Sequence, residues 1–170
     1  MSAWNTMKLY AVFSPVGHWA NVQHVQPGFR MIASEYLLEC HHIFHDRITE
    51  NERHTLEHTS YSFHLFRVKN EAYTIVTDTE YPTRTAFLLI RHLRQGDSLD
   101  DLVQSFPNPY HADCIAKIQH ELDEIMVIIH KNTDILLEKG EKLVDLVENS
   151  ERLSASAKAV YKSKRYYELL

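Results

Sequence analysis

Paired histidines are the first residues in this chain whose types and spacing could support chemistry. The chain has 12 histidines, and two pairs are spaced four residues apart: His41 and His45, which follow Cys40, and His54 and His58. Two histidines at this spacing can bind zinc. However, the sequence has no HExxH or CxxC motif and no obvious set of carboxylates or cysteines to complete four ligands. We therefore interpret the first pair as a polar helix face and expect no metal, no cofactor and no catalytic residue; a histidine-based metal enzyme is kept as an alternative.

A lysine within an apolar stripe is the second chemical feature. In the stretch LLEKGEKLVDLV (136–147), Leu136, Leu143 and Leu146 recur at three- and four-residue steps on one helical stripe that also contains Lys139. A surface helix normally carries its charges on the opposite face. A buried ammonium group without a partner costs several kcal/mol, and it offers three donors and no acceptor. Three partner helices, each offering a glutamine carbonyl at this level, would satisfy it, and such a residue fixes register and partner number.

The stripe belongs to a long heptad pattern that begins at Ile115. Steps of alternately three and four residues reach Ile115, Ile118, Leu122, Ile125, Ile129, Asn132, Leu136, Lys139, Leu143, Leu146, Ser150, Leu153, Ala157 and Val160, and we call these positions the seam. Only Asn132, Lys139 and Ser150 among them are polar. A sustained period of 3.5 residues predicts a left-handed coiled coil. Because an apolar strip of this length is an aggregation liability in water, other helices or the rest of the chain must cover it.

The residues before the seam have shorter and mixed periods. We predict strands at 7–13, 19–25, 53–58, 60–68 and 71–78, and helices at 28–48 and 83–94, with one more helical turn within 98–106. This order predicts an α+β fold with an antiparallel sheet covered by helices. Pro107 and Pro109 oppose regular structure and indicate a boundary between the two parts.

Composition narrows the function classes further. The net charge of −5 gives no reason to expect nucleic-acid binding, which usually needs a basic face. No window of the sequence approaches the roughly 20 apolar residues of a membrane span. The two cysteines, Cys40 and Cys114, form no disulfide framework, so a reduced cytosolic setting is expected.

Several segments resemble one known family. Residues 117–162, from KIQHELDE to AVYK, resemble the R-SNARE motif of the synaptobrevin superfamily. The segments MKLYAVF, DTEYPTRTAFLLI and NPYHADCIAKIQHELDE resemble the longin domain and junction of its lipid-anchored members, the Ykt type. In that family an arginine of the central layer faces three glutamines in a parallel four-helix bundle. Lys139 stands at the arginine position here, and it is a point charge rather than a planar fork.

The resemblance implies a fold and a division of the chain. The expected fold is a longin (profilin-like) domain at 7–106, with a five-stranded antiparallel sheet and flanking helices. A linker at 107–112 and a long SNARE coiled-coil helix at 113–167 would follow. The implied function is to contribute one helix to a four-helix trans-SNARE bundle in intracellular vesicle fusion, with autoregulation by the longin domain. Tyr36 and Phe44 would line the longin groove that receives the folded-back motif.

The resemblance also implies partners and a location. Three Q-SNARE helices would bind the open motif, and the chain's own longin domain would bind it in a closed state. The family members end in paired cysteines within a prenylation signal, whereas this sequence has no cysteine after Cys114. We therefore expect attachment through a lipid anchor not present in these 170 residues, with cycling between the cytoplasm and the cytosolic face of Golgi, endosomal or vacuolar membranes. A non-fusogenic SNARE-like regulator without an anchor is the alternative.

Overall fold

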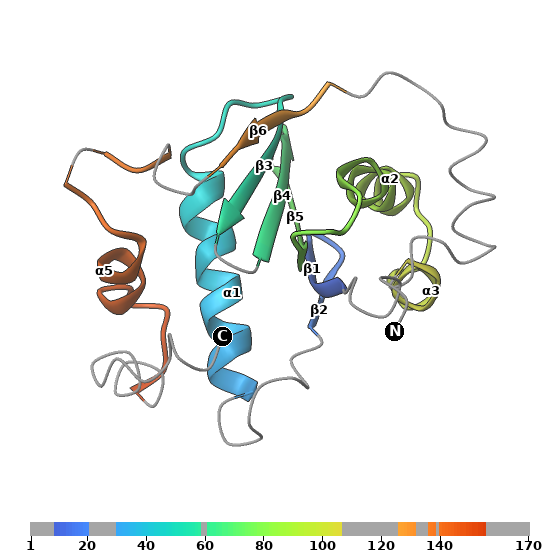
Figure 1. The fold of residues 1–170 in the computed structure, drawn as a ribbon. Coiled ribbons are helices and arrows are strands. Elements are labelled where there is room, and N and C mark those ends of the chain that lie inside the picture. Colours follow the sequence, from blue (N-terminus) through green and yellow to red (C-terminus); the bar gives the residue numbers. More distant parts are fainter. Residues whose placement is uncertain are drawn as a thin grey trace.

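Six strands form a single mixed sheet in the computed structural model (Figure 1). The structure describes residues 9–20, 30–58, 61–106, 126–131, 136–138 and 140–155. The elements are β1 (Leu9–Ser14), β2 (Gly17–Ala20), α1 (Arg30–His45), β3 (Arg53–His58), β4 (Tyr61–Val68), β5 (Glu71–Asp78), α2 (Thr83–Arg94), α3 (Leu99–Ser105), β6 (Ile128–His130) and α5 (Leu143–Glu148). The strand order is β2-β1-β5-β4-β3-β6, in which β6 pairs parallel to β3 and all other neighbours are antiparallel.

Short turns and β-branched or aromatic residues explain the antiparallel part of the sheet. The β4–β5 hairpin closes at Lys69 and Asn70, where Lys69 adopts a positive φ of 54°. Its strands place Phe63 opposite Val76, a pair that suits a pleated and buried surface. The sequence predicted this hairpin and the strand at 53–58 with their observed bounds, except that residue 60 lies outside the described residues.

Helices cover both faces of the sheet. Figure 1 shows α1 and α5 on one side of the strands and α2 with α3 on the other. The first side contains a buried cluster that includes Leu56 and Phe63 of the sheet and Phe44 of α1. The second side contains a cluster built around Phe87 of α2, with Phe106 at the end of α3. The sheet therefore has two hydrophobic layers, as expected for the predicted α+β class.

The predicted five-stranded antiparallel sheet differs from the observed sheet. The sixth strand, β6, comes from the seam region and is parallel to its neighbour. The sequence VII at 127–129 is β-branched throughout, which favours a strand when an unpaired sheet edge is nearby. The heptad pattern concealed this preference because these residues also fit a helix.

The described part of the seam region also differs from the single long helix that we expected. It contains the strand β6 and the short helix α5, and Gly140 between them has a φ of +90°. A residue in this conformation interrupts a helix. A coiled-coil helix gains most of its stability from partner helices. In this single chain the described seam residues Leu136, Leu143, Leu146 and Leu153 pack in or against the cluster between α1 and the sheet instead. The predicted strand 19–25 overlaps β2, which begins two residues earlier at Gly17, and residues 21–29 lie outside the described part. The predicted helix 28–48 is observed as α1, which ends three residues earlier at His45.

His41 and His45 of α1 face the sheet and are not part of a solvent-exposed polar face, so that prediction was wrong in this respect. His41 Nδ1 lies 2.6 Å from Thr74 Oγ1, and His45 Nε2 donates a hydrogen bond to the Tyr73 carbonyl at 2.9 Å. Both side chains are buried, as is His64 of β4. Their hydrogen bonds to strand residues give these histidines a structural role. Within the described residues, no group of three or more histidine, cysteine or acidic side chains is placed to hold a metal ion.

Candidate functional site

The apolar side chains of α5 and the residues after it are covered by α1. Leu143, Val147 and Leu153 are buried in the same cluster as Tyr36 and Phe44 of α1. Partly buried side chains that pack against this cluster from the same segment are Leu136, Leu137 and Leu146. The segment 136–155 thus contributes one side of a hydrophobic interface, and α1 with the sheet contributes the other (Figure 1).

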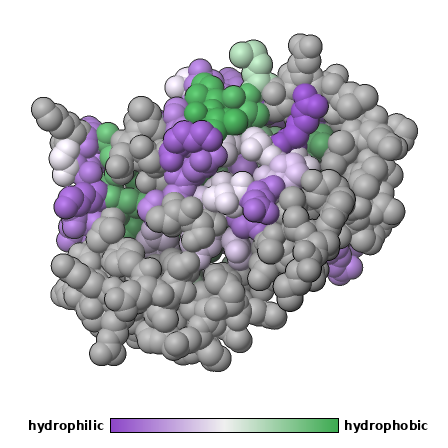
Figure 2. Space-filling view, viewed as in Figure 1, coloured by the Kyte–Doolittle hydropathy of each residue, from purple (hydrophilic) through white to green (hydrophobic). Residues whose placement is uncertain are grey.

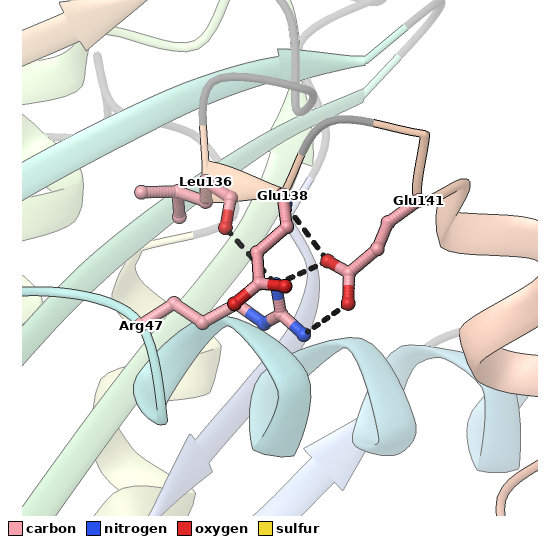
Figure 3. Close-up of polar contacts among 4 residues, drawn as sticks. All are labelled: Arg47, Leu136, Glu138 and Glu141. Carbon is pink, nitrogen blue, oxygen red and sulfur yellow. Dashed lines mark hydrogen bonds and ion pairs between the residues drawn. The ribbon is translucent and has the colours of Figure 1, made fainter.

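An arginine just after α1 fixes the start of this segment (Figure 3). Arg47 Nη1 and Nη2 donate to the Glu141 carboxylate at 2.5 and 3.2 Å, and Nη1 also donates to the Leu136 carbonyl at 3.3 Å. Glu141 in addition accepts the backbone N–H of Glu138 at 2.8 Å. The hydrogen bond to Arg47 lowers the pKa of Glu141 and raises that of Arg47. This bidentate ion pair ties Leu136, Glu138 and Glu141 to the end of α1.

A second arginine–glutamate pair fixes the far end of the segment. Arg152 Nε and Nη2 donate to the two carboxylate oxygens of Glu39 at 3.1 and 3.0 Å. The Glu39 side chain is only 3 % exposed. Burial raises the pKa of Glu39, but hydrogen bonds from Arg152 and Ser150 outweigh this effect and leave the pKa lowered. The buried Glu39 carboxylate therefore has its charge compensated by this segment, through Arg152 and Ser150.

A third contact joins β6 to the sheet edge. The parallel pairing aligns Leu56 of β3 with His130 and His54 with Ile128. His54 Nδ1 lies 3.1 Å from His130 Nε2, and Lys131 Nζ donates to Glu57 at 3.2 Å. The backbone of 128–130 thus pairs with the N–H and C=O groups on the outer edge of β3, which would otherwise have no strand partner on that side.

The apolar side chains of the seam region differ in how exposed they are. Met126 and Ile129 are 85 % and 53 % exposed, and Ile128 is exposed as well. Figure 2 shows a hydrophobic patch at the top of the molecule, where β6 lies in Figure 1. In contrast, Leu143, Val147 and Leu153 are buried in the cluster that contains Tyr36 and Phe44 of α1, and Leu146 packs against it. The apolar side chains of the described seam region are therefore exposed around β6 and covered around α5.

The structure places about half of the predicted site residues. Tyr36, Phe44, Leu143 and Leu153 are buried together, Leu136 and Leu146 are partly buried beside them, Ser150 lines a small pocket with Glu39 and Ile43, and Ile129 is exposed. Outside the described residues lie Lys139, Ile115, Ile118, Leu122, Ile125, Asn132, Ala157 and Val160. Whether these sets act as a seam and a groove remains a prediction.

Sequence reasoning missed several residues of the interface, among them Val147, Leu137 and four charged residues. Val147 is fully buried, and its position four residues after Leu143 was a usable signal because it widens the helical stripe. The charged residues Glu39, Arg47, Glu141 and Arg152 gave no such signal. Nothing in the sequence pairs an acid with a base that is about 100 positions away.

No helix among the described residues is long and apolar enough to cross a membrane. The interface consists of apolar contacts and ion pairs that bury one segment against α1. Such an arrangement binds that segment to the rest of the domain without any covalent link.

Comparisons with known proteins agree with this picture. Residues 34–123 match the Longin family model, a regulated-SNARE-like domain, and residues 114–166 match the Synaptobrevin model. The chain is 32 % identical over 139 residues to the protein named synaptobrevin homolog YKT6 from Debaryomyces hansenii, which covers 68 % of this chain and 70 % of the relative. The Saccharomyces cerevisiae protein of that name matches with the same identity and coverage. The protein of that name from Schizosaccharomyces pombe is 30 % identical over 138 residues, which covers 69 % of this chain and 70 % of that relative.

Proposed function

This chain belongs to the longin-domain R-SNAREs of the synaptobrevin family, which act in vesicle fusion, and we propose that its own longin domain regulates that activity. In the proposed closed state, residues 136–155 lie against α1. In the open state, the same residues leave α1 and join partner helices. Because the two states use one apolar strip, they compete, and partners act by shifting the population between them.

The burial of α5 against α1 is the observation that supports this proposal. Leu143, Val147 and Leu153 are buried in the core cluster that contains Tyr36 and Phe44. Each buried aliphatic side chain contributes about 1.5–3 kcal/mol relative to exposure. Partner helices must therefore cover these side chains at least as well as α1 does before the closed state opens.

We assign the partners as three Q-SNARE helices. The longin domain would span 7–106, a linker 107–112 and the R-SNARE motif 113–167. Lys139 would occupy the central layer opposite three glutamines, and the other seam positions from Ile115 to Val160 would form apolar layers on either side. The work of the protein is then coupled folding and burial of the motif, and no covalent bond changes.

The proposed location is the cytosolic face of Golgi, endosomal or vacuolar membranes. Attachment would use a lipid anchor, as in the lipid-anchored members of the family. A single acyl chain gives marginal binding, so stable attachment normally takes two signals. Cycling between the cytoplasm and these membranes would follow from the closed and open states of the motif.

An exchange of charges between Arg47 and Glu141 tests the closed state. Arg47→Glu places two carboxylates together where the ion pair now lies, because the Arg47 and Glu141 side chains meet at 2.5 Å. We expect faster amide hydrogen exchange in residues 143–153 and unchanged exchange in β4 and β5. The double variant Arg47→Glu with Glu141→Arg should restore most of the protection.

The matched control is Arg94→Glu, which alters a weaker pair with Glu71 on the opposite side of the sheet. It should leave exchange in 143–153 unchanged. If Arg47→Glu leaves that segment as protected as in the unaltered protein, or if the double variant restores nothing, the pair does not hold the closed state.

Substitution of Lys139 tests the central layer. Lys139→Arg should preserve assembly with three glutamine-bearing helices, because the cation and its three contacts remain. Lys139→Leu should keep or raise the thermal stability of the bundle but reduce discrimination against helices that lack the glutamine, since the polar requirement is gone. Competition binding between matched and glutamine-free partners measures this; equal selectivity of Lys139→Leu and the unaltered chain would contradict the assignment.

A further inference from the structure

The imidazole rings of His54 on β3 and His130 on β6 lie next to each other where the two strands pair. His54 Nδ1 and His130 Nε2 are 3.1 Å apart, and the ring planes differ by only 10°. The ring centroids lie 5.4 Å apart, so the rings meet edge to edge rather than face to face. In this arrangement the two facing nitrogens point at each other, and one proton between them makes a hydrogen bond.

The contact of His54 with Glu52 determines which ring nitrogen of His54 carries a proton. His54 Nε2 lies 3.1 Å from Glu52 Oε2, and a carboxylate can only accept, so Nε2 carries a proton. In neutral His54 the Nδ1 atom that faces His130 is then unprotonated, and it accepts a hydrogen bond from His130 Nε2–H. One added proton can be accommodated, because His54 would then donate to a neutral His130. A second added proton puts two N–H groups against each other with no acceptor between them.

The surroundings offer little to offset that second charge. His54 is buried, and burial together with the neighbouring His54 lowers the pKa of His130. Arg67 of β4 lies on the same face of the sheet and donates to the His45 and Ile48 carbonyls, and Arg47 is engaged with Glu141. Glu57 is engaged with Lys131 on β6. Among the described residues, Glu52 is the acidic group in contact with the pair.

We propose that the His54–His130 pair is a proton-sensitive catch that holds β6 on β3 and releases residues 126–131 when both rings are protonated. This inference rests on the closed state proposed above and names a regulation of it. Release would free a part of the motif that already exposes Met126 and Ile129, and so would extend the surface that a partner helix can reach.

The sign of the pH dependence follows from proton binding. In the released form both imidazoles titrate near the usual pKa of about 6.5, whereas the paired form resists the second proton. The paired form therefore binds fewer protons, and its advantage is present above pH 6.5 and lost as the pH falls. From pH 7.5 to pH 5.5 we expect the pairing equilibrium of β6 to weaken about tenfold for one proton.

Hydrogen exchange of the full chain at pH 7.5 and pH 5.5, corrected for intrinsic exchange rates, tests the catch. Protection in 126–131 should fall about tenfold at the lower pH, beyond any change in the β4–β5 amides. In His130→Gln, an amide replaces the titrating ring and can still donate to His54, so protection should persist and its pH response should vanish. His58→Gln, on the same strand but outside the pair, should respond as the unaltered chain does.

Nitrogen-15 NMR of the unaltered protein provides a second measurement that needs no variant. The ring nitrogens of His130 should titrate below the usual histidine range, because burial and the neighbouring His54 oppose its charged form. A pH response in His130→Gln equal to that of the unaltered chain, or a His130 ring that titrates in the usual range, overturns the inference. Protection of 143–153 with no pH effect at 126–131 overturns the catch alone, whereas absence of protection in both segments at pH 7.5 overturns the closed state itself.

Discussion

Val147→Asp should open the closed state while sparing the bundle. Val147 is 0 % exposed and lies in the cluster that contains Tyr36 and Phe44. Loss of a buried aliphatic side chain costs about 0.5–5 kcal/mol depending on the change, and a carboxylate without a partner in its place costs several kcal/mol more. Val147 follows the seam position Leu146 directly, so it lies beside the predicted layers and is not one of them. The closed state should therefore lose several kcal/mol, and the motif should dissociate from α1.

The measurement is binding to the assembled partner helices together with hydrogen exchange. The apparent affinity for partners is reduced by the fraction of chains that are closed, so Val147→Asp should bind faster and more tightly than the unaltered chain. Asp145→Ala, an exposed change on the same helix, should alter neither closure nor binding. Leu146→Asp should weaken both closure and assembly, because Leu146 is a predicted layer residue that also packs on the longin side.

Hydrogen exchange in β4 and β5 distinguishes opening of the motif from unfolding of the longin domain. A variant that unfolds the longin domain would lose protection in β4 and β5, whereas an opened motif would leave these strands protected. If Val147→Asp keeps residues 143–153 protected and binds partners at the unaltered rate, the packing of α5 on α1 does not limit access to the motif.

Local patterns predicted the longin elements well because their signals lie within short windows. The strands 61–68 and 71–78 are rich in β-branched and aromatic residues around a two-residue turn. The helix 83–94 starts after Pro82 and is followed by Gly96 with a φ of +96°. Each of these features depends on neighbours in the sequence, and tertiary contacts reinforced them.

The motif was harder to predict because, on the proposal made above, its sequence must suit two structures. A heptad period is typical of a helix that packs with other helices, but residues 127–129 are also β-branched and complete the edge of β3 in the single chain. Gly140 allows the turn that Arg47 and Glu141 then hold. A heptad period alone therefore carries no information about the structure that the single chain adopts.

Acid should destabilise the longin domain through three buried histidines. Burial, reinforced by the nearby His45, lowers the pKa of His41 to about 2. Burial lowers the pKa of His45 to about 4, although the hydrogen bond to the Tyr73 carbonyl opposes this, and burial lowers the pKa of His64 to about 3. The contacts explain the preference for neutral rings: His64 lies between Thr55 and Thr77 at 2.9 Å on each side, and His45 Nδ1 is buried with no hydrogen-bond partner among the described residues.

The sign and size of the effect follow from the unfolded chain, where each histidine titrates near pH 6.5. The folded state binds fewer protons than the unfolded state below that pH. The contribution of the three histidines to the free energy of unfolding is therefore fully present above pH 6.5 and decreases as the pH approaches the folded pKa values. Three histidines give a slope of at most about 4 kcal/mol per pH unit between pH 6 and pH 4.5, which is large against a typical total free energy of unfolding of about 5–15 kcal/mol.

Urea unfolding followed by circular dichroism across this pH range measures the slope. His64→Gln, which cannot titrate but can still hydrogen-bond the two threonines, should reduce the slope by about one third even if it is less stable at neutral pH. A slope that is flat in the unaltered protein, or that is the same in His64→Gln, would mean that these rings accept protons in the folded state and that their burial among threonines does not make the domain acid-labile.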